Sequence, residues 1–241
     1  MTTTENQIAE NYCSLLQQIE SACDRAGRTP STVKLVAVTK YAELQWVRAL
    51  LALGVPNLGE SRPQQLIDRA AKISEPVNWH LIGHLQRNKA RRILPLVTLI
   101  HSVDTFRLLA TIERLAQELG RRSSVLLEIN VSGELQKHGF APDELLDGWQ
   151  QVVSCRHVEI KGLMTMAPLS EHPEDARPVF RELRRLRDQL VALSPPSLTL
   201  PELSMGMSRD FKVAIEEGAT LVRIGSNLLT GLHAGEADEV I

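Results

Sequence analysis

The sequence predicts a single (β/α)8 barrel of the TIM type, an α/β fold, with one additional helix at the N-terminus. Three observations support this fold class. The chain has 241 residues, eight short apolar runs along it resemble buried strands, and helical patterns lie between the runs. Strands that alternate with helices form parallel βαβ units, and eight units of roughly 30 residues fill a barrel of this length.

The additional helix is expected at Glu5–Ala26. Apolar residues recur there at the spacing of one helical face, and Gly27 followed by Pro30 ends the pattern. We therefore assign residues 1–33 to this helix and its connection to the first strand.

The strands and helices of the barrel follow in alternation. A doubly wound sheet would normally use fewer strands in this length. No linker interrupts the pattern, so residues 1–241 are expected to form one domain with a short tail at 232–241. The expected strands are Lys34–Lys40, Asn57–Glu60, Asn78–His84, Leu99–Asp104, Ser124–Val131, Glu159–Met166, Thr199–Gly206 and Leu221–Ser226. Helical patterns include Glu43–Leu53, Thr105–Leu119, Pro142–Val153 and Glu174–Leu193.

The composition argues against several classes of function. The formal net charge is -2, with 43% hydrophobic and 23% charged residues, so non-specific nucleic-acid binding is not expected. The N-terminus lacks a secretory pattern and no apolar run reaches the roughly 20 residues of a membrane helix, so we expect a cytoplasmic protein. The three cysteines, Cys13, Cys23 and Cys155, form no disulfide framework.

Lys40 is the first candidate for chemistry, because active sites of such barrels lie at the carboxyl ends of the strands. Strand alternation places Val36, Val38 and Lys40 on one face. If that face lines the barrel, desolvation favours the neutral amine, which adds to an aldehyde to form a Schiff base. The alternative is a lysine that simply ends a strand in solvent.

The last two loops are candidates for anion binding. Gly225 and Ser226 follow the eighth strand and open a helical turn, and the seventh loop has Ser204, Gly206 and a possible N-cap at Ser208. Loops after strands seven and eight commonly bind phosphate in barrels, through free N–H groups. Helix capping alone also explains either turn.

Arg223 lies two residues before Gly225, on the same strand face, so its guanidinium is expected in or near the barrel mouth. A buried arginine needs an acceptor. Glu60 or Asp104 would provide one, and a purely structural ion pair is as plausible as a role toward a ligand.

The histidines predict no metal site. His80 and His84 are four strand residues apart, about 13 Å, too far to chelate one ion. His101 is expected to be a hydrogen-bonded histidine near a strand end. The arginines of 181–187 alternate with acidic residues and are expected on a solvated helix face.

Eight strings of the sequence resemble, in order, the motifs of the pyridoxal phosphate homeostasis protein family. They are LVAVTK, LGE, WHLIGHLQRNK, HSVD, EINVSGELQKHGF, GLMTM, LSMGMSRDFKVAI and VRIGS, and they extend from about Lys34 to Gly231. The resemblance implies the barrel of alanine racemase, known as fold type III among proteins that use pyridoxal 5'-phosphate (PLP).

The resemblance also implies roles for individual residues. Lys40 matches the lysine that holds PLP as an internal aldimine, a Schiff base. Gly225 and Ser226 match the pair that binds the phosphate, although many members have threonine at the second position. The chain reads LGES where members commonly read FGEN, so Ser61 replaces an asparagine.

Four further residues match positions around the cofactor. Ser204, Met205 and Ser208 match residues that border it, and Arg223 matches the arginine near the pyridine nitrogen. A permanent cation there disfavours protonation of that nitrogen and weakens the ring as an electron sink.

The resemblance implies a non-catalytic PLP carrier that takes part in vitamin B6 and amino-acid homeostasis. It also implies transient contact with PLP-dependent apoenzymes and a monomer. The alternative is a small amino-acid racemase, which needs a second acid or base opposite the lysine. The only tyrosines are Tyr12 and Tyr41, and neither is expected to reach that face. A Schiff-base aldolase fits a bare barrel but not the motifs.

Overall fold

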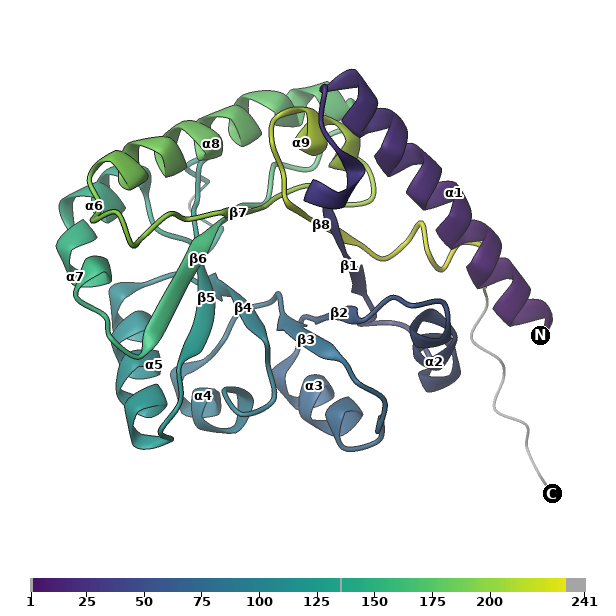
Figure 1. Cartoon of the computed structure of the whole chain (residues 1–241), viewed down its shortest axis with the longest axis horizontal. Coiled ribbons are helices and arrows are strands. Elements are labelled where there is room, and N and C mark those ends of the chain that lie inside the picture. The colour runs from purple at the N-terminus through teal and green to yellow at the C-terminus, as the bar shows by residue number, and fades with distance from the viewer. Residues whose placement is uncertain (1, 135, 233–241) are drawn as a thin grey trace.

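The computed structural model is a closed barrel of eight parallel strands in the order β1 to β8, surrounded by helices (Figure 1). The structure describes residues 2–134 and 136–232. The predicted barrel and its N-terminal helix are confirmed. Most of the predicted tail, 233–241, lies outside the described residues.

The eight strands lie where the apolar runs predict them. Most end sooner than predicted, because the last residues of each run leave the hydrogen-bonded ladder to form the loops of the barrel mouth. Lys40, His84, Asp104 and Ser226 therefore lie just past strand ends. The strands are β1 Lys34–Val38, β2 Asn57–Glu60, β3 Asn78–Leu81, β4 Leu99–Val103, β5 Ser123–Glu128, β6 Val158–Met164, β7 Glu202–Ser204 and β8 Leu221–Ile224.

The helices follow the strands in sequence. They are α2 Leu44–Ala52, α3 Pro63–Ala70, α4 Arg87–Ile93, α5 Phe106–Glu118, α6 Pro142–Asp147, α7 Trp149–Val153, α8 Arg177–Ala192 and α9 Phe211–Glu216. Short 3-10 helices occur at Pro30–Thr32 and Pro173–Ala176. The helical stretch predicted at Pro142–Val153 is found, divided into α6 and α7 at Gly148. A Cβ on Gly148 would lie 2.1 Å from the Phe106 ring, so the chain needs glycine there.

Helix α1, Thr3–Arg25, occupies the place of an eighth barrel helix. Thr2 and Glu5 form a capping box at its start. The helix contacts α9 on one side and α2 on the other, and it lies along the outside of β8 and β1 (Figure 1). In the described part of the chain, β8 is followed by turns rather than a helix. The N-terminal helix thus completes the outer ring instead of adding to it.

The core has two parts. A large apolar layer fills the space between strands and helices, and a small cluster inside the barrel contains Val36, Leu99, Leu126, Met164 and Leu221. No helix of the described residues is both long and apolar enough to cross a membrane.

The solvated arginine face predicted on α8 is only partly correct. Arg181 and Arg184 lie 3.1 and 3.3 Å from the carboxylate of Glu217, whose side chain is 6% exposed, and Arg177 joins them at 3.1 Å. These ion pairs tie α8 to the end of α9, a contact that charge alternation along one helix does not reveal.

Candidate functional site

A cavity of about 860 Å³ opens at the carboxyl ends of the strands. The loops after β1, β6, β7 and β8 form most of its wall. Five of the predicted site residues line it: Lys40, Ser208, Arg223, Gly225 and Ser226. Ser204 and Met205 are fully buried and lie outside the lining.

Lys40 projects from a turn two residues beyond β1. Its carbonyl oxygen accepts a hydrogen bond of 2.8 Å from Gln65, which fixes the backbone of the turn. The side chain is exposed, and its Nζ lies 4.8 Å from the centre of the Tyr41 ring. The desolvated lysine expected from strand alternation is therefore not found, because the ladder ends before residue 40.

The loop after β8 brings a second group of donors beside Lys40. β1 and β8 are paired, with Ala37 opposite Ile224, so the two loops leave the barrel side by side. Gly225 passes so close to β1 that a Cβ would lie 3.0 Å from the carbonyl oxygen of Val38. Within the described part of the chain, the N–H groups of Ser226 and Asn227 have no acceptor.

The loop after β7 has the same character. The predicted N-cap at Ser208 is wrong, because α9 begins at Phe211 and its N-cap is Asp210. The Asp210 carboxylate accepts instead from the backbone N–H of Met207, at 2.6 Å. The N–H groups of Ser208 and Arg209 have no acceptor among the described residues, and both residues line the cavity.

Arg223 reaches the cavity from inside the barrel and is almost fully buried. It donates to Ser204 Oγ at 2.6 Å and to the carbonyl oxygen of Thr165 at 2.9 Å. Burial lowers the pKa of this guanidinium to about 10, against the opposing charges of Glu128 and Asp210.

The partners expected for Arg223 are wrong. Glu60 is engaged by Thr39 at 2.5 Å and by Arg69 at 2.9 Å, and Asp104 faces His84. Spacing along the sequence does not show that each of these carboxylates at a strand end is bound to another side chain.

A buried chain of hydrogen bonds continues from Ser204 across the barrel. His101 Nδ1 lies 2.8 Å from Ser204 Oγ, and His101 Nε2 lies 2.8 Å from His80 Nδ1. Arginine has no acceptor, so Arg223 donates to Ser204 Oγ. The serine hydroxyl keeps its own proton, and one arrangement of the chain has Ser204 donating to His101 Nδ1. In that arrangement the proton of His101, and that of His80, lies on Nε2. His101 is thus a central residue of the barrel rather than a strand-end histidine.

His80 and His101, the two histidines in this series of hydrogen bonds, are held neutral. Burial lowers the pKa of His80 to about 4 and that of His101 well below its ordinary value. Ser204 Oγ and the carbonyl oxygen of Thr165 accept from Arg223 and hold the guanidinium in place.

Several wall residues were not predicted from the sequence. Arg209 and Asp210 follow the predicted Ser208, and the loop from Met166 to Ala176 covers one side of the cavity. Ser61, which replaces the asparagine common in the resembling family, also lines it. The string SMGMSRD was a usable signal for Arg209 and Asp210, whereas nothing local marks the loop after β6.

The fold and the site define a class of protein. A family model described as alanine racemase, N-terminal domain, matches residues 14–233. Alanine racemase of Clostridium difficile has the same fold, with a TM-score of 0.75 at 13% identity over 96% of this chain and 58% of that chain. The chain is a barrel of the alanine racemase N-terminal type.

Nearer relatives define the family. A pyridoxal phosphate homeostasis protein of Aquifex aeolicus is 40% identical over 91% of this chain and 96% of its own length. One of Pseudomonas aeruginosa is 37% identical over 92% and 94%. PipY of Synechococcus elongatus, solved with PLP bound, has a TM-score of 0.81 and 36% identity over 92% of this chain and 99% of that chain. This chain belongs to the pyridoxal phosphate homeostasis protein family.

Proposed function

We propose that this chain binds PLP in the cavity, with Lys40 as the covalent attachment point, and serves vitamin B6 and amino-acid homeostasis as a carrier. One observation carries the proposal: a lysine amine and two loops with free N–H groups share one cavity. The relatives named above and the PLP bound to PipY support the same assignment.

The residues present fit the chemical groups of PLP. When bound, PLP supplies an aldehyde that condenses with a lysine amine and a phosphate that accepts hydrogen bonds. The exposed amine of Lys40 is available for the first group. The hydroxyl of Ser226 and the N–H groups of Ser226 and Ser208 are donors for the second, and Arg209 adds a cation.

Ser204, Met205 and Arg223 act from behind the cavity wall in this proposal. Ser204 and Met205 support the wall, and Ser204 also orients Arg223. Arg223 is a cation with no acceptor atom, so a pyridine nitrogen facing it stays unprotonated. An unprotonated ring withdraws electrons less strongly, which restrains carbanion chemistry at a bound amino acid.

The absence of turnover is part of the proposal, since a racemase needs a second acid or base opposite Lys40. The Tyr41 ring packs against the amine of Lys40, on its own side of the cavity. Tyr12 lies on α1, outside the barrel, and His84 is not among the described residues that line the cavity. Racemase activity remains the second candidate, and His172 and Asp210, which both line the cavity, are the side chains to test as its second acid or base.

We also propose that PLP is released to other proteins, because exposed apolar side chains lie at the mouth of the cavity. Four exposed apolar side chains line the cavity, and they suit brief contact with a PLP-dependent apoenzyme. They are Tyr41, Met166, Leu169 and Met207. A cytoplasmic monomer is the state we propose for this exchange, and sedimentation analysis tests the monomer.

A PLP titration tests binding. PLP added to the cofactor-free protein should give a yellow species with saturable absorbance, and Lys40→Ala should not form it. Lys89→Ala, a variant of a lysine outside the cavity lining, is the matched control and should behave as wild type. Equal spectra for Lys40→Ala and wild type would refute the assignment.

Incubation with single enantiomers of alanine and serine in deuterated water tests turnover. A carrier should show negligible exchange of the α-hydrogen. Formation of the opposite enantiomer at enzymatic rates, roughly 1 to 10³ per second, would instead establish a racemase.

A further inference from the structure

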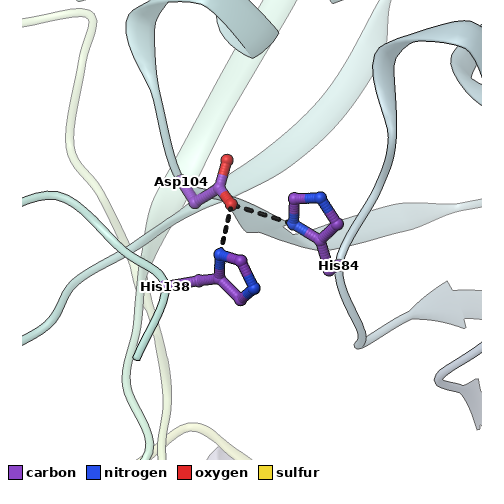
Figure 2. Close-up of side chains that lie close together, drawn as sticks. All are labelled: His84, Asp104 and His138. Atoms are coloured by element: carbon purple, nitrogen blue, oxygen red, sulfur yellow. Dashed lines mark hydrogen bonds and ion pairs between the residues drawn. The ribbon is translucent and has the colours of Figure 1, made fainter. Parts of the chain in front are cut away.

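A cluster of two histidines and one aspartate lies on the same end of the barrel as the cavity but outside the cavity lining (Figure 2). Asp104 directly follows β4, His84 is three residues past β3, and His138 comes from the loop between β5 and α6. Three separate connections thus bring their side chains to one point. Neither PLP binding nor the buried chain behind Arg223 uses these residues.

The ligand atoms of the cluster are close enough to share one ion, and in the structure His84 Nδ1 and Asp104 Oδ2 form a hydrogen bond. Asp104 Oδ2 lies 3.0 Å from His84 Nδ1 and 3.6 Å from His138 Nδ1. Ligands at Zn–N and Zn–O distances of about 2.0 to 2.1 Å, in tetrahedral arrangement, are about 3.4 Å apart. The two observed distances bracket that value. All three ligand atoms lie within 4.8 Å of one another.

The surroundings of the three side chains favour coordination. Both imidazole rings have Nδ1 next to the same carboxylate oxygen, Asp104 Oδ2. The rings themselves are stacked, with centres 4.4 Å apart and planes 19° from parallel. The side chain of Asp104 is 5% exposed, and Thr105 Oγ1 lies 3.4 Å from its other oxygen, Oδ1. A partner on the second oxygen orients a carboxylate ligand.

We propose that His84, Asp104 and His138 bind a divalent transition-metal ion of the Zn²⁺ type. Two imidazoles and one carboxylate are borderline ligands that suit such an ion, and three protein ligands leave one position open to solvent. The histidine side chains are 43% and 61% exposed, so an ion can enter. The expectation of no metal site rested on the distance between His80 and His84 alone, and the present proposal replaces it.

Zinc binding to the purified PLP-loaded protein tests the site, after dialysis that removes metals and free PLP. The protein carries Cys13→Ser, because Cys13 is an exposed thiol that also binds zinc. Calorimetry should find one Zn²⁺ per chain. His138→Ala and His84→Asn should each weaken binding by at least about 10-fold, since each removes one of three ligands. Co²⁺ should give visible absorption bands that both variants lose.

His157→Ala is the matched control. His157 lies 2.8 Å from Glu113, a pair with only one histidine and one carboxylate, so this variant should bind zinc as the parent does. Absorbance of bound PLP in each variant verifies that it is folded. A parent protein that binds no zinc, or histidine variants that bind zinc as tightly as the parent, would overturn the proposal.

Discussion

Arg223 is a buried cation in the barrel interior. It can only donate, so Ser204 Oγ accepts from it, and the hydrogen bonds continue from Ser204 to His101 and from His101 to His80. Neutral histidines suit this site, because a protonated His101 would be a second buried cation close to Arg223. The chain behind the cavity therefore requires that these histidines stay uncharged.

The unfolding free energy should consequently fall in acid. His80 has a folded-state pKa of about 4 against an ordinary value of 6.5, so below pH 6.5 the unfolded chain takes up a proton that the folded chain refuses. The contribution of neutral His80 to the unfolding free energy is fully present above pH 6.5 and is lost as the pH falls toward 4. When the pH is lowered from 7 to 5, the unfolding free energy of His80→Gln, measured in urea, should decrease by about 2 kcal/mol less than that of wild type.

Glu128 should give the opposite pH dependence of the unfolding free energy in the same experiment. Burial, followed by the charge of Asp104, raises its pKa from 4.5 to about 7, so its contribution is present below pH 4.5 and is lost as the pH rises through 7. Glu128→Gln should thus be stabilising at pH 8 by up to about 3 kcal/mol, and by less at pH 5. Parallel pH dependence of the two variants would contradict the buried-charge account.

Ser226 is the residue to test for the phosphate. Ser226→Ala removes one hydroxyl donor to a charged acceptor, worth about 1.5 to 3 kcal/mol, so PLP affinity should fall about 10- to 150-fold. The control is Ser132→Ala, at a serine whose hydroxyl is bound to Glu134, away from the cavity lining. Unchanged affinity in Ser226→Ala would place the phosphate elsewhere.

Residue identities were predictable where a strand end fixes the position. Lys40, Arg223, Gly225 and Ser226 all line the cavity, because they lie at or just past the carboxyl ends of the paired strands β1 and β8. The partners of Arg223 and the contact of His138 with Asp104 were not predictable. They depend on side chains from elements far apart in sequence, whose meeting is set by loop paths.

At the scale of elements, α1 both completes the helix ring and supports the last loop. Asn11 Nδ2 donates to the carbonyl oxygens of Leu228 and Thr230, at 3.1 and 2.9 Å. Arg28, just past the helix, donates to the carbonyl oxygen of Ile215 at 2.7 Å, at the end of α9. Periodicity predicted the helix, but not that it takes the ring position next to β8, which the described residues after β8 leave to it.

Asn11→Ala should therefore loosen the turn that carries Ser226. Two hydrogen bonds of about 0.5 to 1.5 kcal/mol each are lost, so we expect a decrease of about 1 to 3 kcal/mol in the unfolding free energy and weaker PLP binding. Gln17→Ala, at an exposed position of the same helix, is the control for helix propensity. Full PLP affinity in Asn11→Ala would mean that the turn is held without α1.

For the whole molecule, the barrel gathers one amine, one buried cation and two donor loops at one end, and it leaves the opposite wall without an assigned base. The eight-strand count and the strand order followed from alternation of apolar runs and helical patterns. The shape of the cavity did not, because the loop from Met166 to Ala176 has no periodic signal. The central claim is that this arrangement holds PLP at Lys40.

Borohydride reduction of the PLP-loaded protein, followed by peptide mapping, tests that claim most directly. Reduction makes the link between PLP and its lysine permanent, so the account predicts the pyridoxyl group on the peptide that contains Lys40. Lys137 is the informative alternative, since its Nζ lies 3.5 Å from the carbonyl oxygen of Met166, which lines the cavity. Label on Lys137, Lys34 or Lys89 in place of Lys40 would contradict the account.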